Sequence, residues 1–236
     1  ELGGEKRACE ANHAPQAKKI LKRIRVEFSN ADLWVQRSED DEAHVVFPEG
    51  MEDDYATGEE DGMTVIRERC VKSEMDASRI RDQFMSIRSL EDMRSALHSL
   101  GSMIQKHVKT GHVTIKVPES FLEAMQIHVT NGDVRIEGIA CPELGMTTTN
   151  GDLHALLAGE SHCVSFHSTN GDISIRGNMG KVSTSTVNGD VDLEGSIRQA
   201  EMTSVSGDLR MAIENAGAVN ASLKTTSGAF TKNFSI

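Results

Sequence analysis

The sequence predicts an all-β protein: a flattened β-solenoid of single-stranded, β-helix-like coils with one helical insertion. Three observations support this: a recurring Gly-Asp turn, alternating apolar residues on both sides of it, and one stretch of helical periodicity. The turn recurs as Asn-Gly-Asp and then changes to Ser-Gly-Asp and Ser-Gly-Ala. Its glycines lie 18–21 residues apart, a spacing typical of one coil in a stacked repeat.

The repeated tripeptide is interpreted as a structural turn. Asn and Gly both tolerate positive φ, which a tight reversal of the chain demands, so we expect positive φ at both positions. The predicted turn residues are Asn131, Gly132, Asn150, Gly151, Asn170, Gly171, Asn188, Gly189, Gly207 and Gly228.

Residues around each turn alternate between apolar and polar, which predicts strand, turn, strand in every coil. The position four residues before the Asn or Ser of each turn is occupied by Ile127, Met146, Phe166, Thr184, Met202 and Leu223. The position directly after the Asp or Ala is occupied by Val134, Leu153, Ile173, Val191, Leu209 and Phe230. The position two residues before the Asn or Ser forms a column of mostly small hydroxyl residues: Val129, Thr148, Ser168, Thr186, Ser204 and Thr225. We expect these columns to point inward and to line a narrow core.

In chain order, residues 1–17 read as a polar tail or linker and residues 18–236 as the solenoid domain. Ile24, Val26 and Phe28 alternate up to Asn30-Ala31-Asp32, which predicts a first coil with Ala in place of Gly. Strands are expected at 43–47 and 63–67. Thr110-Gly111-His112, whose Gly lies 21 residues before Gly132, predicts a further degenerate coil.

Residues 38–62 contain eleven acids and no Lys or Arg. Like charges repel, so this run is interpreted as a solvated, partly flexible loop, with a cation-binding or partner-docking loop as the alternative. Without the run, the net charge of −11 falls to about zero. No basic face remains, so a nucleic-acid role is not expected.

The period changes between about 71 and 107, where Ile80, Phe84, Ile87, Leu97 and Ile104 recur at steps typical of an amphipathic helix. We predict a helical insertion that covers an edge or end of the solenoid. The alternative is a helix that docks a partner or a second copy, giving an oligomer.

The cysteines (Cys9, Cys70, Cys141, Cys163) include no Cys-x-x-Cys pair, which argues against common zinc and redox spacings. Cys141 and Cys163 lie about one coil apart, so a disulfide is possible, and separate thiols are favoured. No segment is long and apolar enough to span a membrane, so no direct membrane insertion is expected. No signal segment is visible in a chain that begins at Glu1.

The aspartates of the turns form the sharpest chemical candidate: Asp133, Asp152, Asp172, Asp190 and Asp208. Coils stacked in register place these carboxylates about 4.8 Å apart. A bound calcium ladder could offset their repulsion. We favour local hydrogen bonds from turn backbone N–H groups to each carboxylate, with the Asn side chains laddering beside them, and hence no metal or cofactor.

No catalytic constellation is found. His128 and His167 share an outward column, which also holds Thr147 and Ser185, and they are expected to be too far apart for joint metal ligation without another donor. The nearest approach to an acid–base group is Asp192 and Glu194 beside Arg176. No nucleophile elbow, zinc-protease motif, P-loop or dinucleotide fingerprint occurs.

These features resemble the bacterial putative-adhesin family of unknown function, whose β-solenoids repeat a t-x-x-G-D-v-x-i coil. The matching residues are Ile24-Arg25-Val26 with Ala31-Asp32-Leu33, then 113–118, and the coils from Gly132 to Asp208. The resemblance implies the solenoid fold and a cell-envelope or extracellular location, and it supplies no catalytic residue.

The function expected is therefore that of a non-enzymatic interaction module, which presents a regular Ser/Thr/His face to an unknown protein or glycan. One alternative is a β-helix carbohydrate-active enzyme, which would gather acids in a groove with raised carboxyl pKa values. Another is a structural or sensor scaffold in an envelope complex.

Overall fold

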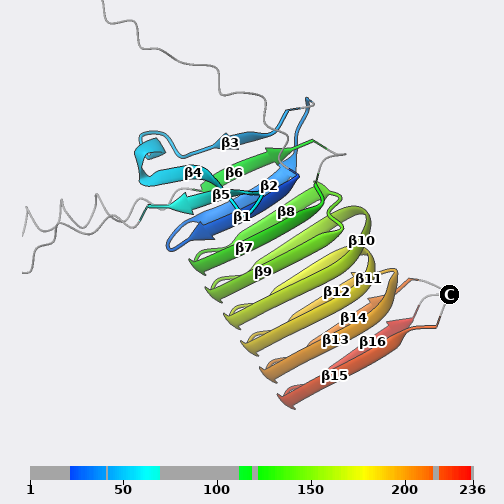
Figure 1. The fold of residues 1–236 in the computed structure, drawn as a ribbon. Helices are drawn as coiled ribbons and strands as arrows, with labels where there is room; N and C mark the ends of the chain where they lie inside the picture. Colours follow the sequence, from blue (N-terminus) through cyan, green and yellow to red (C-terminus); the bar gives the residue numbers. More distant parts are fainter. Residues whose placement is uncertain (1–21, 41, 70–111, 119–121, 215–217, 235–236) are drawn as a thin grey trace, which may run out of the picture.

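The computed structural model describes residues 22–40, 42–69, 112–118, 122–214 and 218–234, and they form the β-solenoid that the sequence predicts (Figure 1). About 74% of these residues are in strands. A single 3-10 turn at Glu52–Asp54 is their one helical element. The predicted helical insertion at 71–107 and the tail at 1–17 lie outside the described residues.

The sheet folds back on itself and makes two walls. Wall A holds the strands that lead into the turns: β5 (Met63–Glu68), β1 (Arg23–Phe28), β7 (Ala124–Asn131), β9 (Glu143–Asn150), the second halves of β10 (Leu153–Asn170) and β11 (Ile173–Asn188), β13 (Ile197–Ser206) and β15 (Asn220–Ser227). Wall B holds the strands that leave the turns: β6 (His112–Val117), β2 (Asp32–Arg37), β8 (Val134–Ile139), the first halves of β10 and β11, β12 (Val191–Gly195), β14 (Leu209–Ile213) and β16 (Phe230–Phe234).

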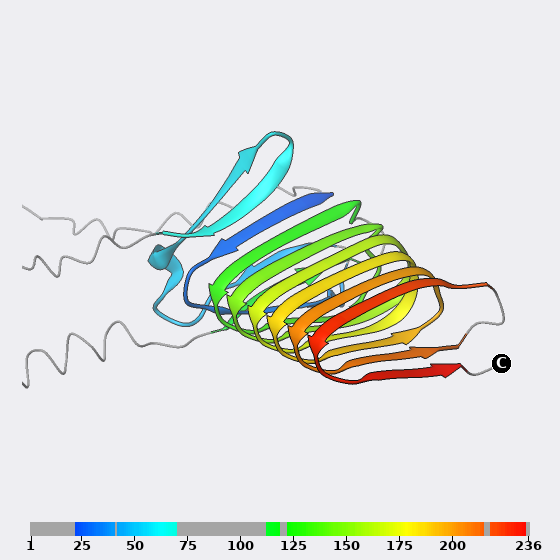
Figure 2. The ribbon, with the colours of Figure 1, turned by 90° about the horizontal axis from the view of Figure 1, so that it is seen from below.

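Within each wall, these strands pair in parallel with the same strand of the next coil, residue for residue. Seen from below, the coils stack as one flattened tube with their turns along one edge (Figure 2). β10 and β11 cross between the walls at the opposite edge, and the pairing register of β10 shifts there, between Leu156 and Glu160.

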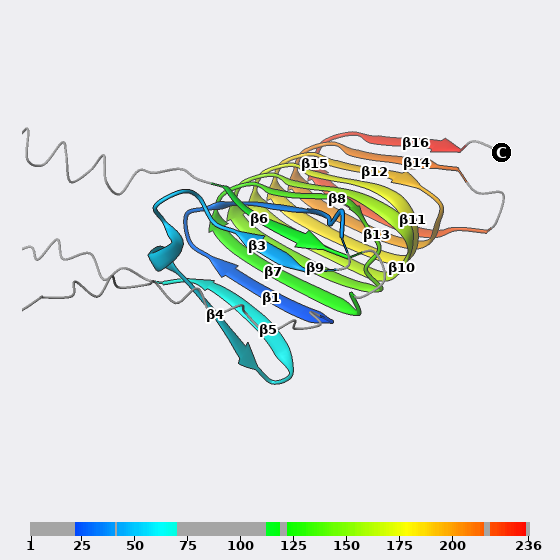
Figure 3. The same cartoon turned by 90° about the horizontal axis from the view of Figure 1, so that it is seen from above.

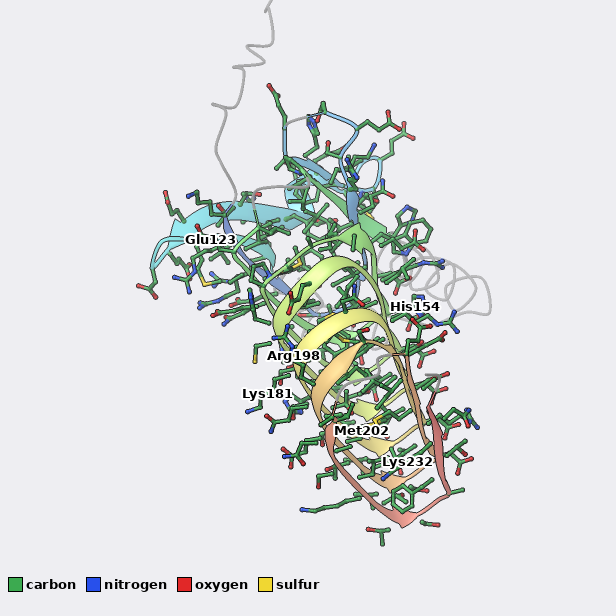
Figure 4. The ribbon with its side chains drawn as sticks, turned by 90° about the vertical axis from the view of Figure 1, so that its right-hand side faces the viewer. Glu123, His154, Lys181, Arg198, Met202 and Lys232 are labelled. Atoms are coloured by element: carbon green, nitrogen blue, oxygen red, sulfur yellow. The ribbon has the colours of Figure 1, made fainter. Side chains whose placement is uncertain are left out.

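The core lies between the two walls and is built from the predicted inward columns. Ile127, Met146, Phe166 and Met202 from wall A are buried, as are Val134, Leu153, Ile173 and Val191 from wall B. Figure 4 shows Met202 between the walls, whereas Lys181 and Arg198 point outward. The period of two thus decides which side chains enter the core, as predicted.

Thr148, Ser168, Thr186 and Ser204 of the small hydroxyl column are also buried, and several hydroxyl groups of the column donate to turn carbonyl groups. Thr186 Oγ1 donates to the carbonyl of Gly171 at 3.2 Å, and Ser204 and Thr225 repeat this contact one and two coils on. A small hydroxyl side chain thus fits beside the turn and satisfies one of its carbonyl groups.

The first coil lies directly against a coil far along the chain. β1 pairs with β7 and β2 pairs with β8 in parallel, so Asn30 and Asn131 become neighbours although they lie 101 positions apart. The turn at Asn30-Ala31-Asp32 is therefore the first of the ladder, as the sequence indicated.

The coil predicted around Gly111 is placed differently. β6 begins at His112 and pairs with β2 on the side away from β8, and β5 pairs with β1 on the side away from β7. These two strands extend the two walls by one further coil. The first coil therefore lies between these strands and the coil at Gly132, and the predicted turn residues Thr110 and Gly111 lie outside the described residues.

The acidic run contains more regular structure than predicted. β3 (His44–Val46) pairs antiparallel with β6, in agreement with the strand expected at 43–47. β4 (Tyr55–Glu60) pairs antiparallel with β5 through a tight turn at Asp61-Gly62, where both φ values are positive. A loop was expected there, and the prediction is wrong because strand pairing and contacts such as Arg67 with Glu60 offset the charge. Figure 3 shows this hairpin projecting from the end of the stack.

The far end of the stack is formed by β15 and β16. Each pairs with one described strand, β13 and β14 respectively. Phe230 is 50% exposed, because no further described coil covers it. The part of the chain that the structure describes contains no helix long and apolar enough to cross a membrane.

Candidate functional site

The predicted turn residues all lie along one edge of the solenoid. Positive φ occurs at each turn glycine, between 151° and 158°, but not at the asparagines: Asp61 is the one non-glycine with positive φ in the described parts of the chain. Positive φ at Asn was therefore a wrong expectation. The strands on either side of the turn pair with neighbouring coils and not with each other, so a hairpin turn is not required.

Glycine is required in this column by the stacking. A Cβ on Gly171 would lie 2.1 Å from the carbonyl oxygen of Gly151, and the same contact repeats at Gly189 and Gly207. The backbones of successive turns are therefore in direct contact at this edge and leave no room for a side chain, which explains why glycine recurs at this position.

Each turn aspartate binds the next coil. Asp133 Oδ1 accepts the backbone N–H of Asp152 at 2.9 Å, and the same contact continues through Asp172, Asp190 and Asp208. Beside it, the Asn150 side chain donates to Asn131 Oδ1 at 2.8 Å, and the asparagine ladder repeats up to Asn188. The carboxylates accept N–H groups of the next coil, so the expectation of local hydrogen bonds within each turn is wrong, whereas the asparagine side chains do form a ladder. In the described residues no three His, Cys, Asp or Glu side chains group together as a metal site would need.

The outer face of wall A carries the regular Ser/Thr/His columns and is hollowed at one point. Gly145 has no side chain, and no atom lies within 4 Å of where its Cβ would be. Around it lies a shallow depression of about 350 Å³. The polar side chains that line it come from four strands: Arg25, Glu27, Gln126, His128, Thr147, Ser165 and His167.

The two histidines that share a column thus line one hollow. Thr147 separates them in the pairing register, as predicted. Ser165 Oγ lies 3.2 Å from His167 Nε2, a hydrogen bond that orients the ring. The hollow therefore offers several hydrogen-bond donors and acceptors, held on rigid parallel strands.

On one side of the hollow, Glu27 is held in place by an ion pair with Arg67. The Arg67 side chain donates to Glu27 Oε2 at 2.6 Å and also pairs with Glu60 at 3.2 Å. Hydrogen bonding to Arg67 holds the pKa of Glu27 below its usual range, so this carboxylate stays ionised at neutral pH. The pair extends the polar surface of wall A toward the β4–β5 hairpin.

The acid–base group considered for an enzyme lies on wall B, outside both hollows. Arg176 and Glu194 form an ion pair of 3.0 Å on wall B, with both side chains exposed to solvent. Asp192 lies in the neighbouring column, paired in register with Ser174 and Arg210. None of the three lines the wall A hollow or the smaller one on wall B.

The two described cysteines are free thiols. Cys141 is buried and contacts the Glu143 carbonyl at 3.1 Å, whereas Cys163 is exposed. Burial raises the pKa of the Cys141 thiol to about 11. The disulfide left open by the sequence is not formed, and Cys9 and Cys70 lie outside the described residues.

Sequence reasoning missed one feature of wall B. Trp34, the single tryptophan of the chain, is 43% exposed and stacks on His112 with ring centroids 4.3 Å apart. Its position between the inward residues Leu33 and Val35 was a signal of its outward direction. The contact with His112 was not accessible, because it depends on the pairing of β6 with β2.

Comparisons with known proteins agree with this architecture. The family model described as Toastrack DUF4097 matches residues 21–235. The crystal structure of a putative adhesin from Bacteroides fragilis NCTC 9343 is similar, with a TM-score of 0.52 and 16% sequence identity; the match covers 91% of this chain and 93% of that one. At this identity the likeness concerns the fold. No curated protein matches the sequence.

Proposed function

The chain belongs to the Toastrack DUF4097 family, and from that premise we propose that it is a non-enzymatic interaction module that binds its partner on the outer face of wall A. The observation that carries the proposal is the hollow at Gly145, which interrupts an otherwise regular Ser/Thr/His surface. Solenoids commonly bind through extended surfaces of this kind.

The geometry supports binding more than turnover. The hollow is open and shallow, and its polar groups come from parallel strands that hold them at fixed spacings. Donors and acceptors alternate around it, which suits a hydroxyl-rich or peptide-like surface. The partner class is a protein or glycan of the cell envelope or cell surface, the setting suggested by the name of the similar Bacteroides structure.

Filling the hollow tests the proposal. The variant Gly145→Tyr adds a side chain where no atom lies within 4 Å, so the fold is retained and the surface is blocked. Gly58→Tyr is the matched control: it also meets no atom and lies on β4, outside the hollow. Both proteins are probed against a glycan array and an array of envelope proteins.

We expect the chain to bind a defined member of one array, with at least a tenfold loss for Gly145→Tyr and none for Gly58→Tyr. Equal binding by both variants would place the interaction elsewhere on the molecule. Release of reducing ends from an array glycan, abolished by Glu194→Gln, would instead support the β-helix enzyme.

A further inference from the structure

The lone tryptophan lies beside a second hollow, on the opposite wall from Gly145. This hollow measures about 240 Å³ and is lined by Trp34, Val35, Gln36, Arg135 and Glu137. Trp34 and Arg135 face each other in register on β2 and β8. The hollow is therefore a gap between neighbouring coils of wall B, and the indole of Trp34 forms one of its sides.

The two faces of the indole differ. His112 stacks on one face at a centroid distance of 4.3 Å and an interplanar angle of 21°. His112 does not line the hollow, so the hollow lies toward the other face, on the side of Arg135. The stack with His112 holds the ring in place, which lowers the entropy lost when a ligand packs on the free face.

Arg135 leaves this side open because it is held along its own strand. Its Nε donates to Glu137 Oε1 at 2.6 Å, and both side chains are about half exposed, at 54% and 46%. The guanidinium is thus drawn toward Glu137 and does not cover the indole. Gln36 completes the rim with an amide that both donates and accepts.

The chemistry of this hollow selects a class of ligand. A flat aromatic face packs against a flat, C–H-rich surface, while the rim offers donors from Arg135 and Gln36 and acceptors from Glu137 and Gln36. Arg135 and Glu137 neutralise each other, so neither an anion nor a cation is favoured. A neutral pyranose ring combines a C–H face with hydroxyl groups at its edge, and its size suits the volume.

We propose that Trp34, Gln36, Arg135 and Glu137 form a saccharide-binding site for a neutral pyranose, with one sugar face stacked on the indole. The site goes beyond the proposed function of wall A and does not depend on it. Leu156, 46% exposed and paired in register with Glu137, adds an apolar surface for a second sugar unit. The ligand expected is therefore an oligosaccharide.

The single tryptophan makes the test direct, because all tryptophan fluorescence of the protein comes from this site. The full chain is titrated with cellobiose, maltotriose, mannobiose and diacetylchitobiose, and separately with tri-galacturonate and choline. We expect a saturable fluorescence change with at least one neutral sugar, with a Kd in the millimolar range or below.

Variants are compared by saturation-transfer NMR, which needs no tryptophan. Trp34→Ala removes the platform and abolishes sugar binding, and Arg135→Ala weakens it about tenfold, the loss of one good polar contact. Val205→Ala is the control, since Val205 is a comparably exposed apolar residue on wall A and should leave the Kd unchanged.

Three results would overturn the proposal: no saturable change with any neutral sugar at millimolar concentrations, a response to choline or tri-galacturonate alone, or undiminished sugar binding by Trp34→Ala. Gly145→Tyr separates the two proposals, because it blocks wall A and leaves the tryptophan hollow intact. Sugar binding lost in Gly145→Tyr and kept in Trp34→Ala would assign the glycan to wall A.

Discussion

The backbone N–H of Asp152 donates to Oδ1 of Asp133 at 2.9 Å, so two acids one coil apart are held together by the carboxylate of one and the backbone of the other. Two unit charges at coil spacing repel by about 0.9 kcal/mol in water. A hydrogen bond to a charged acceptor contributes about 1.5–3 kcal/mol, so each contact offsets the repulsion. The ladder begins at Asp32 and ends where Ala229 donates to Asp208.

Asp172→Asn should be mild, because the amide oxygen still accepts the N–H of Asp190 and one charge is removed from the ladder. We expect a change in the free energy of unfolding within about 0.5 kcal/mol, of either sign. Asp172→Ala leaves that N–H without its acceptor and should cost about 1 kcal/mol or more. Urea unfolding of the two variants measures the difference.

Calcium distinguishes the two interpretations of the same residues. If the ladder is metal-free, chelator and millimolar calcium leave the melting temperature of the parent chain unchanged. A calcium-dependent rise of several degrees that Asp172→Asn abolishes would show that the carboxylates ligate a cation.

Gly171→Ala should be among the most damaging single substitutions. The added Cβ would lie 2.1 Å from the Gly151 carbonyl oxygen, at a φ of 156° that side chains rarely adopt. We expect a loss of at least about 3 kcal/mol, because strain and steric overlap add. Gly145→Ala is the control, and its unfolding free energy should change by less than about 0.5 kcal/mol, since its Cβ meets no atom. Equal losses at the two sites would remove the stacking argument.

The two described cysteines should differ in reactivity. In a chain with Cys9→Ser and Cys70→Ser, iodoacetamide should modify exposed Cys163 in the folded protein and Cys141 after unfolding. The pKa of the Cys141 thiol is raised to about 11 by burial, whereas an unfolded thiol titrates near 8.5. Mass spectrometry of partly labelled protein decides which thiol reacts first.

The same thiol contributes a pH dependence. Its folded pKa lies above the unfolded value, so its contribution to stability is full below about pH 8.5 and falls as the pH rises toward 11, since the unfolded chain loses the proton first. Cys141→Ala should flatten that part of the profile. A parent and variant with parallel profiles between pH 8 and 11 would contradict the assignment.

The columns of the repeat could be predicted because alternation is local information. Phe166 and Thr186 were assigned inward from period alone, and both are buried. The turn at Asp61-Gly62 also had a local signal, since Asp-Gly favours a two-residue hairpin, and it was missed within the acidic run.

What the sequence could not supply was partner choice. The alternating residues of β6 predict a strand, but its pairing with β2 instead of β8 depends on contacts far apart in the chain. The platform at Trp34 was missed for the same reason: its stacking partner His112 arrives with β6.

Lys232 occupies an unusual place in the repeat. In register it pairs with Met211, in the column that earlier coils fill with buried residues such as Ile175 and Leu193. Lys232 is exposed, near the far end of the stack (Figure 4). A charged residue at an inward position of an edge strand disfavours pairing with another edge.

Lys232→Val should therefore promote association through the β15–β16 end. The substitution removes the charge and adds a β-branched side chain beside Phe230, which is already 50% exposed, so a second copy can bury both. Sedimentation velocity should show a concentration-dependent dimer or larger species that the parent lacks at the same concentration. Thr231→Val is the matched control, because Thr231 is the outward neighbour on the same strand and pairs in register with the exposed Arg210. If both variants associate equally, hydrophobicity of the strand is responsible; if neither does, Lys232 does not protect this edge.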